Sequence, residues 1–198
     1  MTAFAQACAE HAALLEKLGA LEEVVTYVGE ALATAISRGN KVMLIGNGGS
    51  ATDADHLAAE FTGRFQMDRA GMPAMALTTS AAALTAIAND YGYESVFERQ
   101  VEAFGVPGDV LIAISTSGNS ESVNRAVALA RDREIVTVAL TGRDGGTLAR
   151  LAEIIVLVPG DVTARIQEMH LLIGHTWCDT VERALFGPAA DDGAQDQS

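Results

Sequence analysis

A glycine-rich turn, Gly46-Asn47-Gly48-Gly49-Ser50, lies between an apolar run, Lys41 to Ile45, and a helix-forming stretch. The apolar run is typical of a buried strand. We expect Ser50 to cap the helix and Asp53 to lie in its first turn, where the helix dipole favours an acid. Free backbone N–H groups and the dipole would then point at one spot, so the sequence predicts an anion-binding site at this turn.

A second polar loop, Ser115-Thr116-Ser117-Gly118-Asn119-Ser120, also follows an apolar run and precedes a helix start. Hydroxyl groups and free helix N–H groups are what the oxygens of a phosphate monoester require. The alternative is a serine-rich turn with a single helix cap, which needs only one of these hydroxyls. Two such loops at strand ends of one sheet favour a phosphorylated, polyhydroxylated ligand.

His56 and Glu60 are four residues apart and share one face of the helix after the glycine turn. Such a pair is more often a surface or core contact than a site, but this one stands just behind the predicted anion pocket. Gln167 and His175, on the last predicted helix, are eight residues apart, about 12 Å of helical rise. One metal ion would touch both only between two extended side chains, or if the ligands came from different subunits. From the residues alone, the polar groups of this helix, His170 included, are best explained by core packing.

The glycine turn also fits the dinucleotide fingerprint G-x-G-x-x-A, from Gly46 to Ala51. That fingerprint requires an acid about 20 residues later, at the end of the second strand. Asp68 is at about this distance but lies in a polar loop before the strand, and the strand end, 77–80, carries no acid. The residues therefore argue against a nicotinamide cofactor, while a purely structural turn stays open.

Five β-favouring runs alternate with helical stretches along the chain. The predicted strands are 41–45, 74–78, 110–114, 135–140 and 154–158, and the predicted helices include 3–18, 21–37, 81–88, 94–104, 121–131 and 163–185. This alternation predicts an α/β fold, a three-layer α-β-α sandwich with a five-stranded parallel sheet of the flavodoxin/Rossmann-like kind. Ligands of such sheets bind beyond the carboxyl ends of the strands, where both polar loops lie. We expect one domain over residues 1–186, with helices in 3–38 for packing or oligomerisation, and a polar, disordered tail over 187–198.

The composition narrows the function classes. A net charge of −13 argues against nucleic acid as the main partner. Cys8 and Cys178 form no metal or redox spacing. The N-terminal stretch lacks a basic-then-apolar signal pattern, and no apolar run approaches the ~18 residues of a membrane span. We therefore expect a cytoplasmic protein with neither nucleic-acid nor membrane partners.

Several motifs, taken in order, resemble those of the phosphoheptose isomerases, the sedoheptulose 7-phosphate isomerases of the sugar isomerase (SIS) fold. The motifs are IGNGGSATDADHLAAEFTGRF, LTAIANDYGYESVF, ISTSGNS, LTGRDGG and ARIQEMHLLIGH, and the resemblance covers about residues 3 to 186. It implies an aldose–ketose isomerase that converts sedoheptulose 7-phosphate to D-glycero-D-manno-heptose 7-phosphate, the first step of nucleotide-activated heptose biosynthesis. It also implies a homotetramer with active sites at subunit interfaces. One metal ion could then bind Gln167 and His175 from different subunits.

The resemblance further implies roles for single residues. The phosphate-binding residues would be Ser115, Thr116, Ser117 and Ser120. The residues that line the sugar would be Asn47, Gly48, Gly49, Glu60, Asn89, Asp90 and Gln167. The ligands of one zinc ion per subunit would be His56, Glu60, Gln167 and His175. The acid–base pair would be Glu60 and His175.

The chain departs from the family pattern at two positions. Ser80 stands where many members have Asp, and Ala164 stands where some do. If either acid contributes to the sugar site, specificity or rate would differ here. Two non-catalytic alternatives are a protein of this fold that binds the replication initiator and a module that only senses a sugar phosphate. The intact set of His56, Glu60, Gln167 and His175 favours the enzyme.

Overall fold

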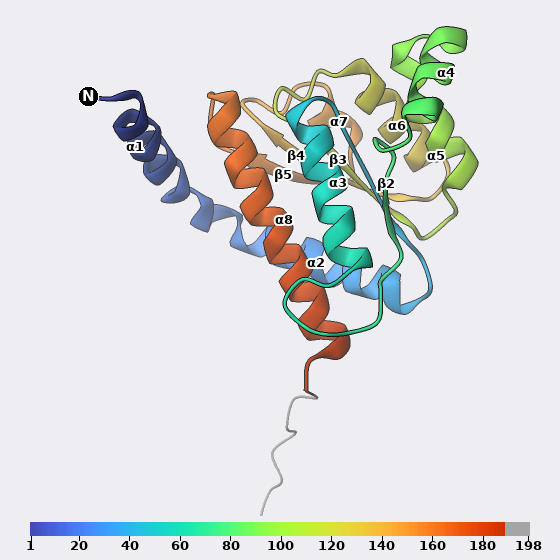
Figure 1. The fold of residues 1–198 in the computed structure, drawn as a ribbon, viewed down its shortest axis with the longest axis horizontal. Coiled ribbons are helices and arrows are strands. Elements are labelled where there is room, and N and C mark those ends of the chain that lie inside the picture. The colour runs from blue at the N-terminus through green and yellow to red at the C-terminus, as the bar shows by residue number, and fades with distance from the viewer. Residues whose placement is uncertain (189–198) are drawn as a thin grey trace, which may run out of the picture.

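A five-stranded parallel sheet forms the centre of the computed structural model, which describes residues 1–188 (Figure 1). The strands are β1 (Val42–Gly46), β2 (Ala74–Ala76), β3 (Val110–Ser115), β4 (Val136–Gly142) and β5 (Ile154–Val158), in the order β2-β1-β3-β4-β5. All neighbouring strands are parallel. The order reverses between β1 and β3, which is where open α/β sheets bind ligands. The predicted α/β fold with five parallel strands is confirmed.

The central strands are buried on both faces, because helices cover the sheet on each side. Along β1, Val42 and Leu44 pack into one core, and Met43 and Ile45 pack into the other. Side chains alternate between the faces of a strand, so a continuous apolar run is what a doubly covered strand requires.

One face of the sheet is covered by α1 (Ala3–Leu15), α2 (Glu22–Ser37), α3 (Gly49–Thr62) and α8 (Thr163–Phe186). α3 and α8 pack side by side across this face, and α1 reaches outward from the body of the molecule (Figure 1). The indole of Trp177 is buried and donates its N–H to the carbonyl of Val25 at 3.0 Å, which ties α8 to α2.

The other face is covered by α4 (Ala81–Tyr91), α5 (Glu98–Phe104), α6 (Glu121–Asp132) and the short α7 (Leu148–Leu151). Phe97, Val101 and Val123 fill the core on this side. A short 3₁₀ helix, η2 (Tyr93–Ser95), joins α4 to α5. The polar loops that follow β1 and β3 come out at the same edge of the sheet.

Several predicted boundaries differ from the structure. The predicted helix 3–18 ends at Leu15 and gives way to a 3₁₀ turn, η1 (Leu18–Leu21). The predicted helix 81–88 continues to Tyr91, because Gly92, at φ +88°, provides the positive-φ end. The predicted helix 94–104 is divided into η2 and α5, and the bend lies where two consecutive side chains, Val96 and Phe97, are both buried. β2 is shorter than predicted because it is an edge strand that pairs with β1 alone.

The predicted tail over 187–198 falls almost entirely on residues 189–198, which lie outside the described residues. Among residues 1–188, no helix combines the length and apolar character needed to cross a bilayer.

Candidate active site

The glycine turn after β1 is built around Gly48. Its φ of +58° and ψ of −122° fall in a region that is left to glycine, and α3 begins at the next residue, Gly49. The prediction that Ser50 caps the helix is therefore wrong, because Ser50 lies in the first turn and its side chain is buried. Asp53 consequently lies in the second turn instead of the first. Burial raises the pKa of Asp53, and attraction to His56 opposes this shift.

Asn47 in this turn is held in one orientation by two hydroxyl groups. The hydroxyl of Tyr93 donates to Asn47 Oδ1 at 2.7 Å, and Asn47 Nδ2 donates to the hydroxyl of Ser122 at 3.0 Å. One amide proton and one lone pair stay free for a ligand. Tyr93 and Ser122 were not among the predicted site residues, because they lie 46 and 75 residues from Asn47 along the chain, where no local pattern links them.

The polar loop after β3, residues 115–120, is called the serine loop below. It lies beside the glycine turn, because β1 and β3 are neighbours and Gly46 pairs with Ile114. Ser115 Oγ donates to Ser120 Oγ at 3.4 Å, and Thr141 Oγ1 donates to the carbonyl of Ser115 at 2.7 Å. Gly118 has φ +64°, and a Cβ there would come within 1.9 Å of the carbonyl oxygen of Gly145. The loop therefore has a fixed shape. Ser115 is buried in it, while Thr116, Ser117 and Ser120 are partly exposed just before α6, whose N-terminal N–H groups favour an anion.

Three predicted metal ligands gather where α3 and α8 meet. His56 Nε2 lies 2.9 Å from His175 Nε2 and 3.5 Å from Glu60 Oε1, and one ligand atom of each residue lies within 4.8 Å of the others. Ligand atoms around a tetrahedral ion lie about 3.3 Å apart, because each is ~2.0–2.1 Å from the metal. Two imidazoles and a carboxylate directed at one point therefore fit a divalent metal ion, with a further position left for a fourth ligand or a substrate oxygen.

His175 is electrostatically suited to bind as a neutral imidazole. Burial lowers the pKa of His175, repulsion from His56 lowers it further, and the carboxylate of Glu60 opposes both effects. The phenyl ring of Phe65 stacks on the His175 ring, with the centroids 5.2 Å apart and the planes at 25°. Phe65 lies in the loop after α3 and was not among the predicted site residues.

The remaining predicted site residues lie nearby but do not join this cluster directly. The amide of Gln167 lies against Gly49, where a Cβ on the glycine would be 2.3 Å from Gln167 Nε2. Asn89 and Asp90 are exposed in the last turn of α4, where Asn89 Nδ2 donates to Asp90 Oδ1 at 2.8 Å. Thr116 and Ser117 are partly buried in the serine loop.

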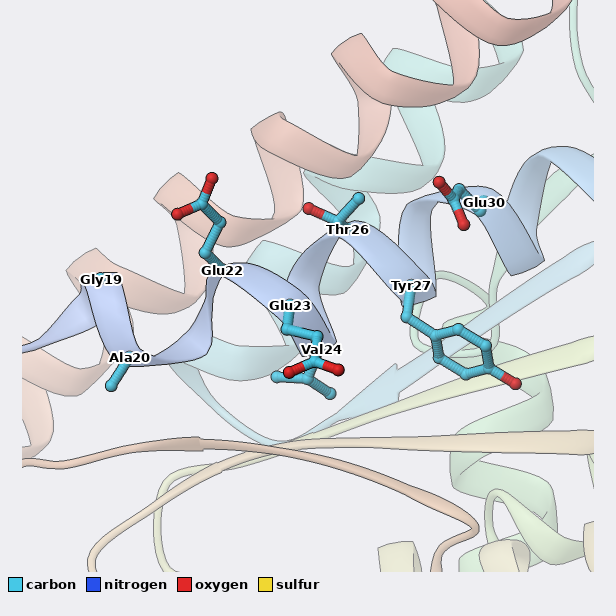
Figure 2. A pocket seen from close by; sticks show the side chains of 8 residues that line it. All are labelled: Gly19, Ala20, Glu22, Glu23, Val24, Thr26, Tyr27 and Glu30. Carbon is cyan, nitrogen blue, oxygen red and sulfur yellow. The ribbon is translucent and has the colours of Figure 1, made fainter.

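A large surface hollow lies away from the predicted site residues. It runs along η1 and α2 and has a volume of about 970 Å³. Figure 2 shows the residues that line it, which are Gly19, Ala20, Glu22, Glu23, Val24, Thr26, Tyr27 and Glu30. None of the predicted site residues lines it. The site itself is an open surface in the single chain, since Gly48, Gly49 and His56 are exposed.

Comparisons with known proteins show the family of this chain. The SIS domain family matches residues 7–142. A phosphoheptose isomerase from Geotalea daltonii is 49% identical over 178 residues, which cover 89% of this chain and 93% of that protein. One from Sulfurimonas denitrificans is 54% identical over 157 residues, with 79% of this chain and 80% of that protein covered. The solved phosphoheptose isomerase of Neisseria gonorrhoeae has a TM-score of 0.86 and 43% identity, and the match covers 90% of this chain and 96% of that one. The chain therefore belongs to the phosphoheptose isomerases of the SIS-domain family.

Proposed function

We propose that the protein is an aldose–ketose isomerase that converts sedoheptulose 7-phosphate to D-glycero-D-manno-heptose 7-phosphate. The observation that carries this function is the meeting of His56, Glu60 and His175 near two anion-binding loops, in a chain that is about half identical to phosphoheptose isomerases over most of its length. The non-catalytic alternatives, initiator binding and sugar-phosphate sensing, are not favoured, because the reactive cluster is intact.

The substrate phosphate is bound by the serine loop in this proposal, through Ser115, Thr116, Ser117 and Ser120. Ser120 supports the assignment, because it occupies the N-cap position of α6 while its side chain makes no capping bond in the described chain. Its hydroxyl is therefore available to a phosphate oxygen. The sugar lies along Asn47, Gly48, Gly49, Asn89, Asp90 and Gln167.

The reaction moves a proton between C1 and C2 of the sugar through an enediol(ate). One group must take the carbon-bound proton while another serves the oxygens. Glu60 and His175 share these two roles. Bound to a metal ion through one ring nitrogen, a neutral His175 would keep the N–H donor of the other nitrogen, which suits it to serve the oxygens while Glu60 takes the carbon-bound proton.

A zinc ion is the proposed cofactor, with His56, Glu60 and His175 as ligands and Gln167 as the fourth. Bound zinc would polarise the substrate carbonyl and stabilise the negative charge of the enediolate. Gln167 lies eight residues before His175, which is about 12 Å of helical rise. We therefore place the completed site at a contact between subunits, where Gln167 of a neighbouring copy can contribute.

The assembly in this proposal is a homotetramer of a cytoplasmic protein, with residues 1–186 as one SIS domain. Its support is the openness of the site and the apolar surface of α1, on which Phe4 is 79% exposed. Exposed apolar side chains of this kind mark contacts between proteins.

Two variants separate the proposed chemistry from the proposed binding. Glu60→Gln removes the base but keeps the shape, so turnover of sedoheptulose 7-phosphate should vanish while calorimetry still detects sugar-phosphate binding. Ser120→Ala removes one hydroxyl from the phosphate, so KM should rise about tenfold, with kcat within about threefold, since a hydrogen bond to a charged group is worth ~1.5–3 kcal/mol. Substantial turnover by Glu60→Gln would overturn the assignment of Glu60.

A further inference from the structure

A buried ion pair joins the loop after α3 to α8. Arg69 Nε donates to Glu182 Oε1 at 2.9 Å, and the two side chains are 1% and 0% exposed. Glu182 also accepts the backbone N–H groups of Phe65, Gln66 and Met67, each at 2.9 Å. Burial alone would raise the pKa of Glu182, but these three N–H donors and the charge of Arg69 outweigh it and lower the pKa. The carboxylate is therefore charged and fully bonded.

The other nitrogens of Arg69 bind the end of α3. Nη1 donates to the carbonyls of Phe61 and Gly63 at 2.7 and 2.9 Å, and Nη2 donates to the carbonyl of Glu60 at 2.8 Å. A third bond from Nη1, at 3.0 Å, reaches the carbonyl of Ala70. The last carbonyls of a helix have no partner within the helix, so the guanidinium satisfies groups that α3 itself leaves open. One buried pair thus links the C-terminus of α3 to α8.

These two helices carry the whole reactive cluster. His56 and Glu60 lie on α3, and Glu60 supplies one of the carbonyls that Arg69 binds. Glu182 follows His175 by seven residues, or about two helical turns, so both side chains lie on the same face of α8. Phe65, whose N–H group Glu182 accepts, places its ring on His175.

We propose that Arg69 and Glu182 are positioning residues, which fix the end of α3 against α8 and hold Phe65 on the His175 ring. Through these contacts they set the directions in which His56, Glu60 and His175 point. The inference rests on the proposed function only in taking these three side chains as the reactive ones. Residues that orient metal ligands and catalytic groups typically affect metal affinity or activity by about 10- to 100-fold.

The first test changes Phe65, whose phenyl ring stacks on His175. Phe65→Leu removes the stacking but keeps an apolar side chain, and Phe65→Tyr keeps the stacking. We expect Phe65→Leu to lower kcat about tenfold or more with KM within about twofold, and to weaken Zn²⁺ binding about tenfold, measured by competition with a chromophoric chelator. Phe65→Tyr should keep most of the wild-type kcat and most of the wild-type Zn²⁺ affinity. If Phe65→Leu matches the wild type in kcat and in Zn²⁺ affinity, the proposal is wrong.

The second test separates positioning from stability. Lys41 and Asp109 form another ion pair, at the opposite end of the sheet, in which Asp109 is buried and Lys41 is partly exposed. Asp109 also accepts the backbone N–H groups of Lys41 and Val106. Glu182→Gln and the control Asp109→Asn should both lower Tm, but only Glu182→Gln should lower kcat and Zn²⁺ affinity. Equal losses in both variants would make the Arg69–Glu182 pair purely structural. If Glu182→Gln does not fold, the Phe65 variants decide the question.

The same measurements distinguish this inference from the proposed function. Absence of turnover by the wild type with sedoheptulose 7-phosphate would overturn the proposed function. The Zn²⁺ affinities of the wild type and of Phe65→Leu would still support or overturn the positioning role.

Discussion

His170 and His175 lie on the same helix, five residues apart, in opposite environments. His170 is fully buried, and its Nε2 lies 3.1 Å from the carbonyl oxygen of Thr141. Burial is the main cause that lowers the pKa of His170 to about 4. His175 is partly exposed, next to His56 and Glu60. The prediction that His170 packs in the core is confirmed. His175 differs because α3 brings it reactive neighbours.

The buried His170 should make stability depend on pH. Its pKa is about 4 in the folded chain and about 6.5 when unfolded, so below pH 6.5 the unfolded state binds the proton and the folded state resists it. Stability is then lost as the pH falls. From pH 7.5 to 5.0 this group should cost about 2 kcal/mol. We expect His170→Gln to show a correspondingly weaker pH dependence in urea unfolding curves, and equal dependence in both proteins would contradict this.

Sequence pattern predicted the residue types of the site but not the contacts that orient them. Spacing on one helix placed His56 and Glu60 together, because the helical period is fixed. Tyr93, Ser122 and Phe65 act through hydrogen bonds or ring contacts between segments that are distant along the chain. Such contacts depend on how helices and strands pack together, so no local pattern in the sequence predicts them.

The packing of α3 on α8 brings the two halves of the site together. The two helices run in the same direction, with Gly49 beside Gln167 and Leu57 beside Gly174. A Cβ on Gly174 would come within 2.4 Å of Leu57 Cδ1, so the close approach depends on the glycine. This spacing places His175 within reach of His56.

The substitution Gly49→Ala tests the contact between Gly49 on α3 and Gln167 on α8. A methyl group there would occupy the space of the Gln167 amide, 2.3 Å from Nε2, and would displace a flexible side chain while the backbone stays in place. Gly49→Ala should therefore keep the free energy of unfolding within about 1 kcal/mol, because alanine favours helix, while kcat/KM falls about tenfold.

The matched control for this change is Gly19→Ala, because a Cβ at Gly19 meets nothing within 4 Å. It should leave steady-state kinetics unaltered. Wild-type kinetics for Gly49→Ala would show that the position of Gln167 does not matter.

The alternation of strands and helices was predictable, because the periodicity of apolar residues directly reports which faces are buried. Helix ends were less predictable. Ser50 was a reasonable cap by type, but Gly48 supplies the turn and starts α3 earlier. Asn89 and Asp90 are residues that commonly end helices, but Gly92 ends α4 after them.

In the proposed homotetramer, we expect sites that are shared between subunits. If Glu60 comes from one subunit and Gln167 from another, two inactive variants can complement each other. We expect Glu60→Gln and Gln167→Ala to be nearly inactive alone, and a tetramer co-assembled from both to regain part of the activity, because some sites then hold both native residues. Co-assembled tetramers, verified by mass, that stay inactive would place the complete site within one subunit.

We expect this chain to move a carbon-bound proton of a sugar phosphate with Glu60. The most direct measurement is the conversion of sedoheptulose 7-phosphate in D₂O, followed by NMR, with the zinc-loaded wild type and Glu60→Gln side by side. We expect a manno-heptose 7-phosphate that carries solvent deuterium at C2 with the wild type, and no conversion with the variant. Product without deuterium would contradict an enediolate exposed to solvent exchange, and conversion by Glu60→Gln would contradict the role of Glu60.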